Sequence, residues 1–100
     1  MNVKNLTMTA LLLSATLVTL SVSAEVVKKG LPACSSEDLL DELIGYSAKH
    51  DNDGMMELLK NGSCTFLKEG DKVSVISLGF MTTSIRYKGI KLFTPTEAVH

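Results

Sequence analysis

The chain has 100 residues and a nearly balanced charge, with 10 lysine and arginine residues against 11 aspartate and glutamate residues. This balance argues against a nucleic-acid-binding protein, because such proteins present a strongly basic face. The length allows one domain only. Two cysteines alone make an incomplete zinc site, so the composition favours neither a DNA-binding protein nor a zinc protein.

The first 24 residues have the pattern of a secretory signal peptide. Lys4 provides a positive start, residues 11–22 are apolar, and Val22, Ser23 and Ala24 form a small-residue cleavage site. A buried core helix and a transmembrane anchor are the alternatives, but the apolar run is short and rich in serine and threonine for a membrane span. We therefore predict cleavage of residues 1–24, export to the periplasm of a Gram-negative bacterium, and no stable membrane insertion afterwards.

Residues 25–33 follow the predicted cleavage site. They contain two adjacent lysines, Gly30 and Pro32, which are typical of a chain segment near a terminus rather than of a packed element. We predict a flexible, extended leader here. The folded domain is then expected to begin at Cys34 and to extend to residue 100.

Two helices are predicted within residues 35–62. Ser35 or Ser36 is a suitable N-cap for the first helix, which should end near His50. Its apolar residues recur at three- and four-residue spacing, which gives one buried face; they are Leu39, Leu40, Leu43 and Ile44. The second helix is expected over residues 55–60, with Asp53 as its cap and Gly62 as its stop.

The two cysteines, Cys34 and Cys64, flank this helical segment. An exported protein meets an oxidising compartment, and the sequence contains no CxxC redox motif. We therefore predict a structural disulfide between Cys34 and Cys64. In the chain-entropy model a loop of about 30 residues gives roughly 3.5 kcal/mol of stabilisation.

Residues 64–100 alternate apolar and polar side chains between glycine-containing turns, which predicts a β-meander. Strands are expected at 64–67, 73–78, 81–87 and 90–93, with turns around Gly70, Gly79 and Gly89. The alternation slips at Ile76 and Leu78, which indicates a bulge or bend that switches the apolar side chains to the other face. Pro95 ends the last strand because it has no N–H to donate, and a short helical turn follows.

The order of these motifs resembles the bacterial SH3-like domains of exported proteins. The resemblance covers residues 64–99 and is carried by Gly62, Cys64, Gly70, Val73, Val75, Gly89, Phe93, Pro95, Glu97 and Ala98. It implies a small barrel and a binding role rather than catalysis, without implying one ligand. The fold class predicted is therefore α+β, with an N-terminal helical hairpin packed on a four- to five-stranded antiparallel SH3-like barrel or bent sheet.

Several residues were considered as catalytic or metal sites. The acidic run that begins at Asp51 does not match an EF-hand, because positions 5 and 6 are then Met55 and Met56. His50 and His100 have no evident third ligand. No Gly-x-Ser-x-Gly nucleophile motif is present, and bridged cysteines provide no thiol nucleophile. We predict no enzyme activity, no metal site and no cofactor.

The sequence favours a non-catalytic binding module that contacts an envelope protein or a cell-wall component, and an inhibitor of a wall-degrading enzyme is one concrete form. The alternative is an accessory envelope protein of a conjugative plasmid or phage, acting in conjugation, exclusion or host interaction. A minor enzyme or a metal carrier is a third hypothesis. The binding residues expected on the exposed sheet are Thr82, Ser84, Arg86, Lys88 and Lys91.

Overall fold

The computed structural model describes residues 23–100, so the predicted signal peptide lies outside the described residues except for its last two positions. The described part contains two helices, one short 3-10 helix and six strands, which confirms the α+β class. In chain order the elements are β2 (Ser23–Val26), β3 (Pro32–Cys34), α1 (Glu37–Ala48), α2 (Asn52–Lys60), β4 (Cys64–Phe66), β5 (Lys72–Ser77), β6 (Thr82–Tyr87), β7 (Ile90–Pro95) and η2 (Thr96–Ala98).

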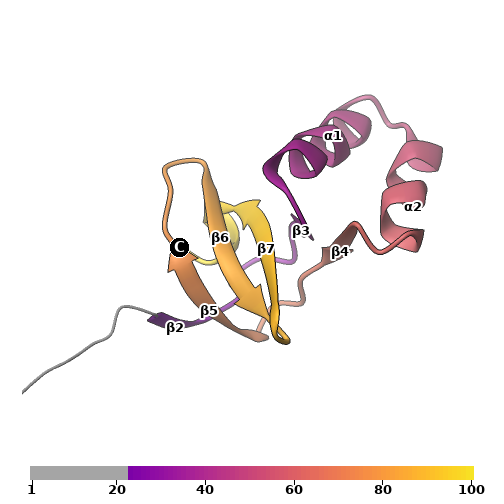
Figure 1. The fold of residues 1–100 in the computed structure, drawn as a ribbon. Helices are drawn as coiled ribbons and strands as arrows, with labels where there is room; N and C mark the ends of the chain where they lie inside the picture. Colours follow the sequence, from indigo (N-terminus) through magenta and orange to yellow (C-terminus); the bar gives the residue numbers. More distant parts are fainter. Residues whose placement is uncertain (1–22) are drawn as a thin grey trace, which may run out of the picture.

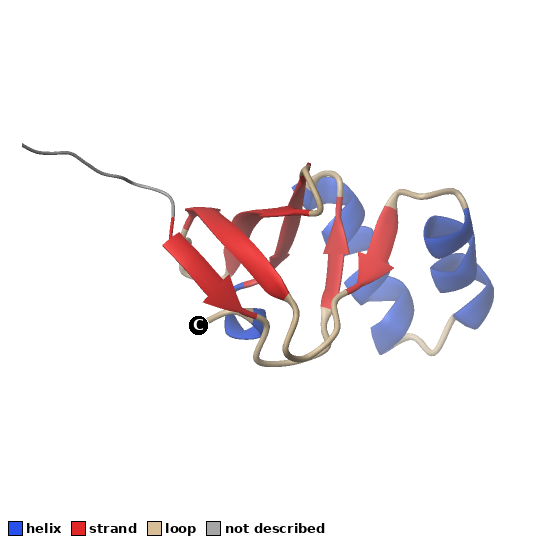
Figure 2. Cartoon of the chain, turned by 90° about the horizontal axis from the view of Figure 1, so that it is seen from below, coloured by secondary structure: helices blue, strands red, loops and turns tan. Residues whose placement is uncertain are grey.

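All six strands belong to one antiparallel sheet in the order β2-β5-β6-β7-β3-β4. The sheet curls strongly rather than lying flat (Figure 2). Strands β5, β6 and β7 are three of the four strands of the predicted meander, but the first predicted strand, β4, pairs with β3 and not with β5. The helices lie together beyond β3 and β4, at one end of the molecule (Figure 1). They therefore leave much of the meander uncovered.

The segment expected to be a flexible leader, residues 25–33, is instead part of the sheet. Val27 and Ala33 are fully buried in the core. Between β2 and β3 the backbone bonds to the chain that follows β4, with Val27 N donating to Asp71 O at 2.8 Å and Leu67 N donating to Leu31 O at 3.0 Å. Lysines, glycine and proline suggested a leader, but the backbone partners come from residues about forty positions later, which no local pattern reveals. The sheet thus has six strands rather than four or five.

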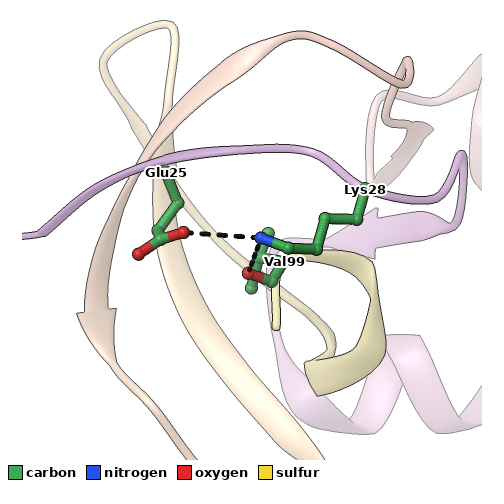
Figure 3. A network of polar contacts seen from close by, with 3 residues as sticks. All are labelled: Glu25, Lys28 and Val99. Carbon is green, nitrogen blue, oxygen red and sulfur yellow. Dashed lines mark hydrogen bonds and ion pairs between the residues drawn. The ribbon is translucent and has the colours of Figure 1, made fainter.

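The two ends of the described chain are tied together. The backbone N–H of Lys28 donates to Ala98 O at 2.7 Å. The Lys28 ammonium lies 3.6 Å from Glu25 Oε1 and donates to Val99 O at 3.3 Å (Figure 3). These contacts tie the segment that follows β2 to the end of η2, so the two ends of the described chain lie beside each other.

Two features predicted for the meander are confirmed. Lys88 and Gly89 both have positive φ, at 52° and 82°, which is the backbone of a two-residue type I′ hairpin. The register of the β5–β6 pair shifts between Val75 and Ser77, so the irregularity lies at the predicted position, Ile76.

The helices begin and end at capping residues. Ser36 Oγ accepts from Leu39 N at 3.1 Å at the start of α1, and His50, with a φ of 59°, follows its end. Asp51, not the expected Asp53, caps α2 by accepting from Gly54 N at 3.1 Å. The helix begins earlier than predicted because Asn52, Asp53 and Gly54 form its first turn, and this also accounts for the acidic run without calcium.

The predicted disulfide is confirmed. Cys34 and Cys64 are directly opposite each other in the β3–β4 ladder and are bonded through their sulfurs. Both are buried in a second hydrophobic cluster, formed with Leu40, Leu43 and Leu58 of the helices. The first cluster lies inside the curled sheet and contains Val27, Ala33, Leu67, Val73, Ile85, Leu92, Ala98 and Val99. The disulfide therefore lies at the base of the helical pair.

Replacing both cysteines by alanine should lower the stability of the oxidised protein by about 3.5 kcal/mol, because the crosslink closes a loop with a sequence separation of 30 residues. Urea unfolding of the oxidised and the reduced proteins measures this change. In reductant the variant should unfold close to the unsubstituted protein. A loss of similar size under both conditions would mean that packing of the two side chains, not the bond, provides the stability.

Candidate functional site

The two most exposed large apolar side chains of the described residues, and a third exposed one, lie in the loop between β5 and β6. Phe80 is 97% exposed, Met81 is 75% exposed and Leu78 is 54% exposed. We call residues 78–81 the apolar loop. A folded protein rarely leaves an aromatic ring fully in water beside two further apolar side chains unless a partner covers them.

A closed ring of hydrogen bonds holds this loop. Thr96 Oγ1 donates to Gly79 O at 2.8 Å, and Gly79 N donates to Thr83 Oγ1 at 3.3 Å. The two threonine hydroxyls are 2.8 Å apart. Because the single Thr96 proton is used on Gly79 O, the Thr83 hydroxyl donates to Thr96. The ring therefore satisfies both backbone groups of Gly79 and fixes the residue that precedes Phe80.

The backbone of the loop is also closely packed. A Cβ added at Gly79 would fall on the carbonyl oxygen of Thr82, so this position requires glycine for space. On the other side of Phe80, Met81 O accepts from Thr96 N at 2.9 Å. Phe80 is thus held between two anchored residues and projects from a rigid loop, which lowers the entropy cost of using it in binding.

An apolar groove adjoins the loop. It consists of two hollows of ≈ 480 and ≈ 390 Å³ that share Ile44, Pro95 and Glu97. The first lies between α1 and η2, and the second is lined also by residues of β3, β4 and α2. We call it the α1–η2 groove. Its first part is lined by Leu40, Asp41, Ile44, Phe80, Met81, Thr82, Pro95, Thr96, Glu97 and His100. The projecting ring and the groove therefore lie next to each other on one side of the protein.

The binding residues predicted from the sequence are spread over different environments. Arg86, Lys88 and Lys91 are exposed around the β6–β7 turn, at the end of the meander opposite the apolar loop (Figure 1). Ser84 is buried, at 7% exposure, and pairs with Phe93 in the neighbouring strand. Thr82 lies at the start of β6 and lines the α1–η2 groove. These five residues do not form one surface.

The charged end of the meander has its own internal contacts. The Lys88 ammonium lies 5.2 Å from the centre of the Tyr87 ring, and the Lys91 ammonium lies 5.3 Å from the centre of the Phe93 ring. The Tyr87 hydroxyl donates to Asp71 Oδ2 at 2.6 Å. This hydrogen bond to the carboxylate raises the pKa of Tyr87 above its ordinary value. Lys88 and Lys91 therefore already have contacts within the β6–β7 hairpin.

Sequence reasoning did not select the apolar loop. Gly79 was identified as a turn, but Leu78 and Met81 were assigned to the strands on either side of it and Phe80 was given no binding role. The available signal was three large apolar residues around a glycine between two predicted strands. A turn made of apolar residues is unusual, since turns are commonly built from glycine, asparagine, aspartate and serine.

Residues 23–100 contain no cluster of three or more histidine, cysteine, aspartate or glutamate side chains arranged to bind a metal ion. Among the same residues, neither helix has the length and apolar character that a membrane crossing needs. Comparison of the chain with protein families, with curated proteins and with solved structures found no match.

The close approach at Gly79 leads to a prediction about stability. Gly79→Ala should destabilise the protein by about 1–3 kcal/mol, because the loop backbone must move away from Thr82. Gly45→Ala is the matched control. Gly45 lies inside α1 with open space around its Cβ position, so alanine should stabilise the protein by about 0.5–1 kcal/mol. Thermal unfolding of the two variants measures both changes, and equal effects would contradict the loop geometry.

The hydrogen-bond ring can be tested at Thr83. Thr83→Val keeps the shape but removes the hydroxyl from the ring, and should cost about 1–3 kcal/mol because Gly79 N loses its acceptor. The amide proton of Gly79 should also exchange faster with solvent. Thr82→Val, one residue earlier and only half-buried, serves as control. If the two valine variants were equally stable and exchanged alike, the ring would not be holding the loop.

Proposed function

We propose that the protein is a small non-catalytic binding module of the bacterial periplasm, and that it acts by docking on an envelope protein. The observation that carries this proposal is Phe80, which is 97% exposed on a loop fixed at both sides. Aromatic side chains and methionine are enriched at the centres of protein interfaces, where a few such residues provide most of the binding energy.

An exported location is supported by the disulfide, because such bonds persist in oxidising compartments. The signal-peptide pattern of residues 1–24 points to the same pathway. The disulfide joins residues 34 and 64, so removal of residues 1–24 would leave it intact. After cleavage Glu25 and Val26 would stay paired with β5.

An SH3-like arrangement is part of the proposal. The curled antiparallel sheet, the β5–β6–β7 meander and the 3-10 helix after β7 support it. On this interpretation the two helices are an insertion between β3 and β4, whose strands are joined by the disulfide. The binding surface then combines the barrel, through the apolar loop, with the insertion, through α1.

A protein partner suits this surface better than a cell-wall glycan. The apolar loop presents one phenylalanine with leucine and methionine beside it, which together form a hydrophobic contact rather than a polar sugar-binding face. The partner can be a wall-degrading enzyme that the module inhibits, since a rigid projecting aromatic is suited to enter a pocket on a folded protein.

Photo-crosslinking tests the proposal. A benzoylphenylalanine placed at position 80, in cells that naturally export the protein, should yield one discrete adduct with an envelope protein. The same residue at position 90 is the control, because Ile90 is also exposed, at 60%, but lies at the opposite end of the meander. Adducts of equal yield at both positions, adducts with wall fragments only, or no adduct at position 80 would contradict the proposal.

Phe80→Ser provides the quantitative test. The ring is in water in the free protein, so the free energy of unfolding should change by less than about 0.5 kcal/mol. Its loss from the centre of an interface should weaken binding by about 2 kcal/mol, which corresponds to roughly thirtyfold in Kd. Binding of the crosslinked partner to the purified variant measures this, and an unchanged Kd would exclude Phe80 from the interface.

A further inference from the structure

We infer that the α1–η2 groove binds a segment of the partner in which an aromatic or aliphatic side chain stands next to a lysine or arginine. This inference rests on the proposed function and specifies the chemistry of the partner.

The groove is apolar along its floor. Ile44 is 44% exposed on α1, and Pro95 faces it from the end of β7 in both hollows. Leu40 and Met81 line one hollow, while Met55 and Phe66, which is 43% exposed, line the other. An apolar floor of this kind gains free energy when a partner's apolar side chain displaces water from it.

The charges on the rim are negative. Asp41 and Glu97 line the groove, His100 is the one other titratable side chain that lines it, and no lysine or arginine lines either hollow. Glu97 is 3.9 Å from the Lys29 ammonium, but both side chains are more than half exposed, so this pair is weak and easily exchanged for another cation. Asp41 has no ion-pair partner within residues 23–100. Both rim carboxylates can therefore pair with a lysine or arginine of a partner.

The residues around the groove add to the negative charge of its rim. Helix α1 carries Glu37, Asp38, Asp41 and Glu42, all exposed. Residues 35–63 contain seven acidic residues and two lysines, whereas residues 23–34 and 64–100 together contain four acidic residues and seven lysines or arginines. The molecule is therefore strongly dipolar, and its negative pole is the helical pair beside the groove. Such a field speeds the approach of a positively charged segment.

This charge pattern also distinguishes between a protein partner and a membrane surface as the ligand of the groove. A loop with exposed phenylalanine and methionine resembles a lipid anchor, but anionic lipids attract surfaces in which the apolar residues are flanked by lysine and arginine. Here the charged residues that flank the apolar ones are Asp41 and Glu97, while Lys88 and Lys91 lie at the far end of the meander and Lys29, which is paired with Glu97, does not line the groove. The charge next to the groove favours a basic protein segment over an anionic lipid surface.

The experiment uses a phage-displayed library of random 12-residue peptides, selected on the full disulfide-bonded protein. Enriched peptides should contain an aromatic or aliphatic residue within a few positions of a lysine or arginine. One enriched peptide is then synthesised, and its Kd is measured by calorimetry against the protein and its variants. Enrichment of acidic or uncharged peptides, or no enrichment, would overturn the inference.

Two double variants separate the effect of the rim carboxylates on binding from the effect of the protein's net charge. Asp41→Asn with Glu97→Gln should weaken binding of the peptide about tenfold at low salt, as expected for two partly exposed charge pairs. Asp53→Asn with Glu69→Gln removes the same charge from exposed positions outside the groove and should change Kd by less than about twofold. Ile44→Ser should abolish binding. Equal losses in the two double variants would overturn the inference.

Flotation with vesicles of phosphatidylglycerol tests the membrane outcome. The protein should not float with them, and flotation that requires Phe80 would overturn the inference. The crosslinking at position 80 keeps the two proposals distinguishable. If the position-80 adduct forms but the groove variants bind the peptide normally, the groove assignment fails while the docking function stands. If the groove binds the peptide as expected but no position-80 adduct forms, the docking function by way of Phe80 fails instead.

Discussion

The short ladder between β3 and β4, crosslinked by Cys34 and Cys64, joins the two halves of this protein. On one side β3 pairs with β7 and contributes Ala33 to the core inside the curled sheet. On the other side the two sulfurs are packed among the leucines of α1 and α2. Each strand has only three residues, so few backbone hydrogen bonds are available to hold the helical pair. The covalent bond supplies the constraint that such a short ladder lacks.

The position of this link decides what surface the protein presents. Because α1 is fixed beside β3, it stands next to the end of β7 and η2 without covering them, and the α1–η2 groove is the space between. The apolar loop is held at the mouth of the groove by hydroxyls from β6 and η2. The apolar loop on the sheet and the α1–η2 groove beside the helices are thereby brought together. In the docking function proposed above, the exposed acidic residues of α1 would favour a positively charged segment of the partner.

Predicted elements and observed ones differ mainly where distant residues meet. The caps at Ser36 and after Ala48, the positive-φ turn at Lys88 and Gly89, and the bulge near Ile76 follow from residue types and spacing, because each depends on neighbours within a few positions. Residues 25–33 were misjudged because their strands exist only through pairing with β5, β7 and the chain after β4. The expected binding residues failed to converge for a related reason. Alternation predicts which side chains share a face, but in the folded chain Ser84 is buried opposite Phe93, and Thr82 lies at the other end of β6 from the cations.

The sequence by itself determined the secondary elements after residue 35, the pairing of the only two cysteines and the α+β class, since these depend on local spacing, on turn chemistry and on there being one possible intramolecular bridge. Only the tertiary structure decided that the N-terminal segment joins the sheet, that Phe80 is left in water, and that Asp41 and Glu97 line the same apolar groove. The residues that the N-terminal strand pairs with, and the two carboxylates that line the groove, are more than forty positions apart along the chain. They are set by how two small cores are joined through β3 and β4, and a pattern read along one dimension does not contain that geometry.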